Sequence, residues 1–587
     1  MVSSYNTKQR EEMAHTGTKQ KEVEKDVLTA LVKSPDEKQK QEKLGLGDEV
    51  ELTPIEKLME AAGTRGRFQR RFNWTFNLLV VIFAGMPYVN IVIALTVPDH
   101  WCHVPGREAT NYTEDQWKAL HIPRRAGNGS FEQCLVFNSS GDEPIPCQHG
   151  WDYDRTWFSR TAPSQEDWVC DRRLHAVNVL SFGQLGEVVG TFAFARMGDL
   201  YGRRPAFFLS AVSSAVTHCL MACTASIYPL FFAVTLLASA TNAATFQAPL
   251  VFSLEVSDEE TKGFVAMLQC VGWTLGMMGM PMIAWACRDW VPFMIITSAP
   301  LGFAILLWKW FPESPRWLAS QGEEERCLAS LREIARVNGR TLPPATLQNL
   351  REAAGHKEKG VGVSSLFSSW TLFRNVMLLS VCRMIFSLAY YSVILNVTNL
   401  GGNPFLNWSV QSLAELPGYV AARFLADRLG RRWTLVGSVV GASVGNYIAA
   451  SIVAEHGSSP AMTVLSVVIR LSLVLVNYTA YLQANEMFPT CVRQTGTAIG
   501  NIAACILGVL GPYIVHLGTW DARLPFLVVG GITTLGAVLA SFLPETLHVR
   551  LPETLHEARS FGRDQPYFSC LALRRRRQRR SPQPPPL

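Results

Sequence analysis

The chain of 587 residues carries a formal net charge of +6, is 48% hydrophobic and has only 17% charged residues. Length alone would allow several soluble domains, but the apolar residues gather into long uncharged runs, the first of which extends from Asn73 to Thr96. At about 1.5 Å per residue this run is long enough to cross a ~30 Å hydrocarbon core. A buried helix of a soluble protein would normally show a polar face. The positive charge flanks these runs and gives no support to nucleic-acid binding.

Twelve runs of this kind are predicted, six on each side of a charged segment. The first six are expected near 73–96, 174–195, 205–224, 228–254, 263–286 and 290–311. The second six are expected near 375–398, 405–427, 433–454, 460–486, 494–517 and 522–543. The pattern predicts an all-α membrane protein with twelve transmembrane helices in two six-helix halves.

The distribution of Lys and Arg predicts the orientation of the chain. Both cluster before the first run and at the junction between the second and third runs of each half, whereas the alternate short loops are nearly free of them. The positive-inside rule then places both termini in the cytosol. The expected parts are an N-terminal tail (1–72), a first half (73–311) with a large external loop (97–173), a cytosolic helical insert (312–374), a second half (375–543) and a basic, Pro-rich cytosolic tail (544–587).

The 97–173 segment has two further features of an external loop. It carries three glycosylation sequons, at Asn111, Asn128 and Asn138. It also contains an even number of cysteines, namely Cys102, Cys134, Cys147 and Cys170. In an oxidising compartment four cysteines favour two disulfides, with three possible pairings. Zinc binding is the rival interpretation, but neither the spacing nor the compartment favours it, and no metal site is expected.

A short charged motif occurs once in each half. Residues 198–204 read GDLYGRR, and residues 426–432 read ADRLGRR. Glu255 and Glu313 in the first half are matched by Glu486 and Glu545 at almost the same separation. Three landmarks in the same order indicate a duplicated architecture, which in an apolar chain is typical of a transporter with two halves. No phosphate-binding loop, nucleophile motif or metal-ligand spacing is present in the sequence, so neither an enzyme nor a cofactor is predicted.

Several segments resemble the organic cation, organic anion and carnitine transporter family (solute carrier family 22) of the major facilitator superfamily. The resemblance covers about Leu52 to Glu557. It rests on AGTRGRFQ at 62–69, PDHWC at 98–102, CQHGWDY at 147–153, DWVCD at 167–171, PESPRWL at 312–318 and EMFPTCVR at 486–493. The last two also occur in sugar porters, whereas the loop pieces are more specific.

The resemblance implies a plasma-membrane carrier that moves small organic ions by alternating access. It implies a cation or a carnitine-like zwitterion as substrate, with an organic anion as the alternative within the family. Sodium or a proton is a possible coupling ion. A sugar porter and a receptor-like protein that does not transport remain as further alternatives. The long first loop argues against the former, and motifs present in both halves argue against the latter.

The repeated motif implies a set of gating residues at the cytosolic helix ends. Charge pairs there can hold one face closed and break when it opens, although static caps with topogenic arginines are the simpler alternative. The expected gating residues are Asp199, Arg203, Glu255, Arg316, Asp427, Arg431, Glu486 and Arg493.

Ionisable residues inside spans are costly, so each is a candidate for function. Glu187, Arg383, Glu415, Arg423 and Arg470 stand out, with buried interhelical ion pairs as the structural alternative. Family positions and these charges together imply the following substrate-binding residues: Tyr88, Phe246, Gln269, Arg383, Tyr390, Glu415, Arg470 and Cys505.

Two of these positions depart from the family pattern. Cys505 is neutral where cation carriers have aspartate and anion or carnitine carriers have arginine. Arg383 stands where the family usually has an apolar or aromatic residue, and it shares a helix face with Ser387 and Tyr390. A pocket that contains Arg383, Arg470 and Glu415 has charges of both signs, which favours a zwitterion or an anion over a simple monovalent cation.

Overall fold

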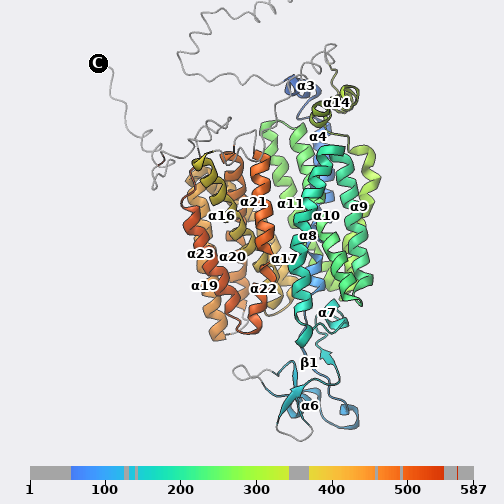
Figure 1. Cartoon of the computed structure of the whole chain (residues 1–587), viewed down its shortest axis with the longest axis vertical. Coiled ribbons are helices and arrows are strands. Elements are labelled where there is room, and N and C mark those ends of the chain that lie inside the picture. The colour runs from blue at the N-terminus through green and yellow to red at the C-terminus, as the bar shows by residue number, and fades with distance from the viewer. Residues whose placement is uncertain are drawn as a thin grey trace, which may run out of the picture. The chain divides into compact units, whose positions relative to one another are not determined.

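The computed structural model describes residues 54–124, 131–138, 143–342, 369–456, 460–488, 493–547 and Gln565. Most of both predicted tails, part of the predicted insert and the sequon at Asn128 lie outside these residues. The chain divides into two units, and Leu58 begins the second, compact one. The second unit consists mainly of long helices (Figure 1).

The described residues of the first half, 67–310, include six long helical segments. The first is one continuous helix with a π-helical centre, made of α4 (Arg67–Phe72), η1 (Asn73–Val80) and α5 (Val81–Ala94). The others are α8 (Leu174–Tyr201), α9 (Arg203–Thr224), α10 (Tyr228–Val256), α11 (Glu259–Cys287) and α12 (Trp290–Gly302), which continues as η4 (Phe303–Trp310).

The second half, residues 370–540, repeats this arrangement. Its first three segments are α16 (Trp370–Leu395) with η6 (Asn396–Asn399), α17 (Pro404–Leu413) followed by α18 (Glu415–Leu429), and α19 (Arg431–His456). Its last three are α20 (Pro460–Met487), α21 (Arg493–Gly508) followed by α22 (Gly511–His516) and η7 (Leu517–Thr519), and α23 (Leu524–Ala540).

Nine helices among the described residues are long and apolar enough to cross a membrane. Three of the expected spans fall outside that set for different reasons. The span near 174–195 is α8, which has the length but includes polar residues such as Glu187. The span near 405–427 is interrupted at Ala414, between α17 and α18. The span near 522–543 is α23, which has only 17 residues.

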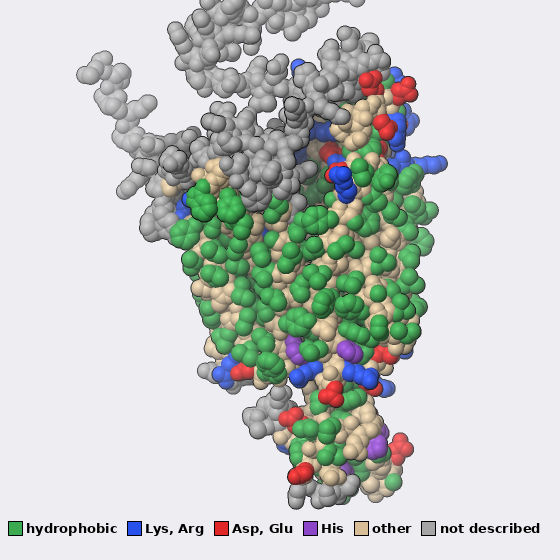
Figure 2. Space-filling view, viewed as in Figure 1, with side chains coloured by type: hydrophobic (Ala, Val, Ile, Leu, Met, Phe, Trp, Pro, Cys, Tyr) green, Lys and Arg blue, Asp and Glu red, His purple; other side chains and the backbone are tan. Residues whose placement is uncertain are grey.

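Close packing between α8 and α10 depends on two glycines. A Cβ atom at Gly186 or Gly190 would overlap the backbone of Leu236 or Ala240 in α10. Small residues of this kind let helix backbones approach within a membrane. The outer face of the helices is apolar, as Figure 2 shows, and includes exposed side chains such as Val189 (67% exposed). Exposed apolar surface of this extent is typical of a lipid-facing bundle rather than of a soluble monomer.

The two ends of the helix bundle differ. The loop end is defined here as the end from which residues 97–173 extend, and the motif end is the end that carries residues 198–204 and 426–432. At the loop end both halves contribute to one hydrophobic cluster, in which Val89 and Met294 pack with Ile394, Phe405 and Trp408. Along the bundle, α11 packs on α17, and α8 packs on α21 and α22.

The 97–173 segment forms a small module with two antiparallel strand pairs. β1 (His100–Cys102) pairs with β4 (Trp151–Tyr153), and β2 (Leu135–Phe137) pairs with β3 (Pro144–Pro146). Its helical turns are η2 (Arg107–Ala109), α6 (Glu114–His121), α7 (Ala162–Gln165) and η3 (Cys170–Arg172). Of the three possible pairings, the cysteines adopt Cys102–Cys147 and Cys134–Cys170.

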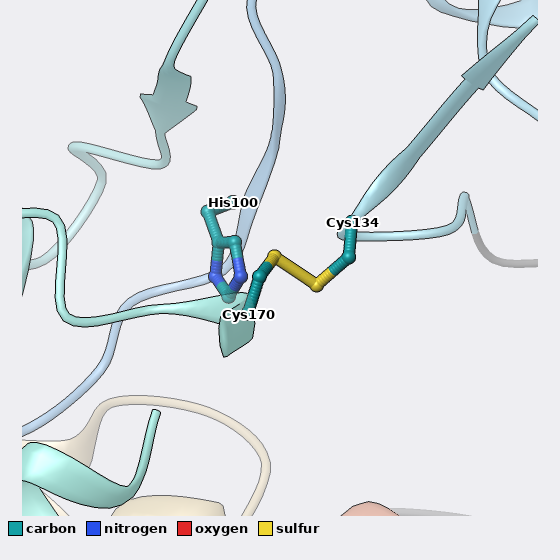
Figure 3. A group of neighbouring side chains, drawn as sticks. All are labelled: His100, Cys134 and Cys170. Atoms are coloured by element: carbon teal, nitrogen blue, oxygen red, sulfur yellow. A yellow bond between two sulfur atoms is a disulfide. The ribbon is translucent and has the colours of Figure 1, made fainter. Parts of the chain in front are cut away.

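His100 lies beside the second disulfide, as Figure 3 shows. One nitrogen of His100 and the sulfurs of Cys134 and Cys170 lie within 4.8 Å of one another, which resembles a metal-binding group. The two sulfurs are bonded to each other, so neither is available as a thiolate ligand. Burial lowers the pKa of the His100 imidazole, and its Nδ1 lies 3.1 Å from the carbonyl oxygen of Pro98.

The module is attached to the corner between α11 and α12. Arg160 pairs with Asp289 at 2.7 Å, and the Arg288 guanidinium donates to the carbonyl oxygen of Arg155 at 2.8 Å. A contact with the second half is made by Phe158, whose ring lies 4.9 Å from that of Phe405.

The insert between the halves begins with two helices, α13 (Pro315–Gln321) and α14 (Glu324–Asn338). The end of α14 is joined to the start of the first half through Asn338. Its amide oxygen accepts from the backbone N–H of Phe68 at 2.9 Å, and its amide nitrogen donates to the carbonyl oxygens of Ala62 and Gly63. The insert thereby packs at the motif end of the first half.

Candidate functional site

Glu415 and Arg470 form a buried ion pair within the second half. Arg470 Nη2 lies 2.5 Å from Glu415 Oε1, and the two side chains are 3% and 0% exposed. Tyr390 donates its hydroxyl to Glu415 at 2.9 Å, and the Arg470 guanidinium lies 4.2 Å from the centre of the Tyr390 ring. Thr274 of α11 donates a further hydrogen bond to the carboxylate at 3.4 Å. Because the two opposite charges are in contact, each compensates the other. Removing either residue would leave an uncompensated buried charge.

Arg383 of α16 has a neutral partner. Its Nη2 donates to Asn501 Oδ1 of α21 at 2.7 Å. Among the described residues no carboxylate forms an ion pair with it. Of the three charges expected in one pocket, Arg383 alone is therefore left without a counter-charge.

Two aromatic side chains from the first half pack against Trp273 of α11. The Trp273 ring lies 5.3 Å from the rings of both Tyr88 and Phe246, in edge-to-face arrangements. Gln269 lies one turn before Trp273 and donates its amide to the carbonyl oxygen of Phe246 at 2.7 Å. The sequence interpretation missed Trp273, although its spacing of four from Gln269 places both on one helix face.

Glu187 of α8 was a candidate for function in the sequence but was not placed among the expected substrate-binding residues. Its side chain is 8% exposed, and Tyr88 donates a hydrogen bond to its Oε1 at 2.5 Å. Cys505, the neutral position, lies in α21, the helix on which α8 packs, and Asn501, the partner of Arg383, stands one turn before it. The two halves thus each contribute one charge near Cys505, a carboxylate from the first and a guanidinium from the second.

At the motif end of the first half, Arg203 links three helices. Its guanidinium lies 3.2 Å from both Asp199 in α8 and Glu255 in α10, and it donates to the carbonyl oxygen of Gly198 at 2.7 Å. The turn that brings α8 to α9 is made by Gly202 at φ 103°. An L side chain rarely adopts this backbone conformation, and its Cβ would also overlap the Glu313 carboxylate.

The second half repeats this geometry residue by residue. Arg431 lies 3.3 Å from Asp427 and 3.1 Å from Glu486, and it donates to the carbonyl oxygen of Ala426. Gly430 makes the corresponding turn at φ 97°. In both halves these pairs join helices of the same half.

Two further carboxylates complete the repeated motif. Glu313 accepts hydrogen bonds from the backbone N–H groups of Arg203 and Arg204, the first residues of α9. Glu545 accepts the equivalent bonds from Arg431 and Arg432 at the start of α19. Carboxylates at helix N-termini are favoured by the helix dipole. Burial raises the pKa of the Glu313 carboxyl, against the opposing effect of these N–H donors.

The remaining expected site residues are placed as follows. Arg316 is the second residue of α13, and Arg493 begins α21, although its side chain lies outside the described residues. Asn111 and Asn138 are exposed on the module.

The features described so far are those of a membrane transporter. They are two duplicated halves of apolar helices, a charged motif at one end of each half and ionisable side chains inside the bundle. Residues 151–556 match the family model described as Sugar (and other) transporter. Among solved structures, the xylose transporter XylE from E. coli in an inward open conformation aligns with a TM-score of 0.54 at 15% identity, covering 83% of this chain and 99% of that one. XylE bound to 6-bromo-6-deoxy-D-glucose aligns equally well, with the same identity and coverage. At this identity the likeness shows the fold, which is that of the major facilitator superfamily.

Sequence relatives identify the branch. The chain is 31% identical over 532 residues to solute carrier family 22 member 7 of Rattus norvegicus, covering 86% of this chain and 98% of the relative. It is 27% identical over 553 residues to the carcinine transporter of Drosophila melanogaster, covering 89% and 81%. The chain belongs to solute carrier family 22, and its function is the transmembrane transport of small organic ions. The family, the fold and the general function expected from the sequence are thereby confirmed.

Proposed function

We propose that this carrier moves a small, carnitine-like zwitterion by alternating access, at a site between its two halves. The observation that carries this proposal is Arg383, a guanidinium inside the bundle whose hydrogen-bond partner is the neutral Asn501. A charge-assisted contact with a substrate carboxylate would supply the missing counter-charge. Glu415 cannot supply it because Arg470 already engages that carboxylate.

The aromatic group around Trp273 supports a cationic portion in the same substrate. Tyr88, Phe246 and Trp273 present a cluster of rings from the first half. Aromatic faces attract organic cations by roughly 0.5–2 kcal/mol each. Tyr390 is less available for this purpose, because the Arg470 guanidinium already lies over its ring. A zwitterion would therefore place its cation toward the first half and its carboxylate toward Arg383.

The packing of the halves supports alternating access. At the loop end the halves share a hydrophobic cluster, whereas the cluster that contains Leu372, Met487 and Leu543 near the motif end belongs to the second half alone. The ion pairs of Arg203 and Arg431 hold each half together as a unit at the motif end. Two rigid halves joined at one end are the arrangement that a rocking mechanism requires.

The proposal includes an orientation in the plasma membrane. The loop end faces outward, because the module there carries exposed sequons at Asn111 and Asn138 and two disulfides. The motif end and both termini then face the cytosol, and the repeated charged motif acts as the cytosolic gate. Sodium or proton coupling is compatible with this arrangement, and measuring uptake with and without a gradient of either ion distinguishes the two.

An uptake screen across charge classes tests the substrate assignment. Purified carrier in vesicles is offered γ-butyrobetaine as zwitterion, choline as quaternary amine and succinate as dicarboxylate, each with and without sodium. Carcinine is included because a relative is named for its transport. We expect preference for the zwitterion, and we expect Arg383→Ala to reduce its uptake by roughly tenfold or more, as loss of a charge-assisted hydrogen bond predicts.

Arg374→Ala is the matched control, because Arg374 lies on the same helix but is exposed near its start. This variant should transport normally. Preference for choline that Arg383→Ala leaves unchanged would overturn the proposal. Preference for succinate that depends on Arg383 would instead support the organic-anion alternative and reject the zwitterion.

A further inference from the structure

A small cavity lies mainly within the first half, and one residue of the second half contributes to its lining. Its lining includes Tyr88, Gln184, Glu187, His218, Asn242 and Tyr391. These residues come from α5, α8, α9 and α10 of the first half and from α16 of the second.

The carboxylate of Glu187 in this cavity lacks a basic partner. Its hydrogen bond is to the neutral Tyr88 hydroxyl at 2.5 Å, and no Lys, Arg or His of the described residues pairs with it. His218 also lines the cavity, but its Nδ1 is engaged by the carbonyl oxygen of Ser214 in its own helix at 2.8 Å. A carboxylate that is only 8% exposed strongly favours a compensating cation.

The position of Glu187 relative to Arg383 indicates where that cation comes from. Arg383 bonds to Asn501 of α21, and α8, which carries Glu187, packs on the same helix, where a Cβ atom at Gly508 would lie 3.1 Å from Gln184. Tyr391 of α16 lines the same cavity as Glu187 from the second half. The aromatic ring of Tyr88, the donor to Glu187, packs on Trp273 at 5.3 Å. A carboxylate, a hydroxyl and two aromatic rings together form a suitable environment for an organic ammonium group.

We infer that Glu187, oriented by Tyr88, binds the ammonium group of the substrate, so that a zwitterion spans the two halves with its carboxylate on Arg383. This inference rests on the proposed function and assigns it a second charged subsite. Because each half holds one end of the ligand, the bound substrate screens both buried charges at once. An anion of the same shape would leave Glu187 uncompensated and is therefore disfavoured.

Two ligands that differ in one atom test this assignment. γ-Butyrobetaine carries a trimethylammonium group, and 5,5-dimethylhexanoate has a tert-butyl group of the same shape in its place. Wild-type carrier in vesicles should prefer γ-butyrobetaine. Glu187→Gln should reduce that preference by about tenfold or more, because it removes the carboxylate and keeps the hydrogen-bonding shape. Tyr88→Phe should reduce it less, because the charge remains.

Glu333→Gln is the control, since Glu333 lies on the exposed face of α14 and pairs with Arg336 there. A merely structural role for Glu187 would lower uptake of both ligands together and leave their ratio unchanged. An unchanged ratio in Glu187→Gln overturns the inference, even if the wild type transports γ-butyrobetaine. Failure of the wild type to transport γ-butyrobetaine overturns the proposed function instead, so the two failures are distinguishable.

Discussion

At the level of single side chains, the charges inside the helices are of two kinds. Glu415 and Arg470 satisfy each other at 2.5 Å and are almost completely buried. Glu187 and Arg383 have neutral partners, Tyr88 and Asn501. Paired charges contribute to the architecture, whereas unpaired charges are suited to recognise a ligand of opposite sign.

The Glu415–Arg470 pair can be tested as a structural element. Arg470→Met alone should destabilise the carrier by about 3–5 kcal/mol, because it leaves a buried carboxylate without its counter-charge. Adding Glu415→Leu should restore most of that loss. Thermal unfolding of the purified protein in detergent measures both effects. Arg326→Met, in an exposed pair with Glu323, serves as control. Equal destabilisation by the single and double variants would contradict this assignment.

The charged positions could be found in the sequence because ionisable residues are rare in apolar runs. Their pairing could not, since Glu415 meets Arg470 only when α18 packs against α20. The sequence therefore grouped Arg383, Glu415 and Arg470 in one pocket of mixed charge. The structure pairs Glu415 with Arg470 and gives Arg383 a neutral partner in Asn501. It also gives a partner, Tyr88, to Glu187, a candidate that the sequence had not placed in the pocket.

At the level of elements, the interior of α8 is adapted to close contact with α10. Gly186 and Gly190 lie one turn apart and face the backbone of α10. This contact holds the helix that carries Glu187 against the wall of the cavity to which α10 contributes Asn242. Precise helix spacing thus determines the width of the candidate cation subsite.

Substitution of Gly190 should separate these helices. Gly190→Val places a side chain on the backbone of Ala240, and overpacking of this kind costs about 1–3 kcal/mol or more. We expect a lower unfolding temperature in detergent and reduced uptake. The control is Gly531→Val in α23, because no described atom lies within 4 Å of a Cβ built there. Similar losses in both variants would mean that valine itself, rather than the contact, is responsible.

Hydropathy predicted the positions of the helices well and their interruptions poorly. The break at Ala414 and the change from α21 to α22 occur inside runs that remain apolar. Each break lies four residues before a proline, because α17 ends at Leu413 before Pro417 and α21 ends at Gly508 before Pro512. A proline has no N–H to donate to the carbonyl four residues earlier, so local propensity does give a signal that hydropathy overlooks. One of these breaks places Glu415 at the start of α18.

At the level of the whole molecule, the repeated motif gives both halves the same internal bracing. The pairs of Arg203 with Glu255 and of Arg431 with Glu486 are largely buried, with exposed fractions between 12% and 16%. Asp199 and Asp427 are 66% and 55% exposed. The equal spacing of the motifs revealed the repeat in the sequence. The sequence did not indicate which of these carboxylates are buried and which are exposed.

The exposed fractions of these carboxylates predict which of the gating residues contribute more to the rate of uptake. Exposed pairs contribute about 0–1 kcal/mol, so Asp199→Asn and Asp427→Asn should slow uptake only modestly. Glu255→Gln and Glu486→Gln should slow it by roughly tenfold, because each removes a half-buried, charge-assisted partner. Initial uptake rates, normalised to the amount at the cell surface, measure this. Normal rates in both glutamine variants, or a greater loss in the asparagine variants, would reject the ranking.

The attachment of the disulfide-bonded module has a practical consequence for imaging. The module is bonded to the end of α11 and the start of α12 through Arg160, Gln165 and Arg288. Its described ring contact with the second half is made by Phe158. An antibody fragment bound to the module would therefore travel with the first half. It would give single-particle images a fiducial marker that distinguishes two pseudosymmetric halves and reports the tilt of one of them directly.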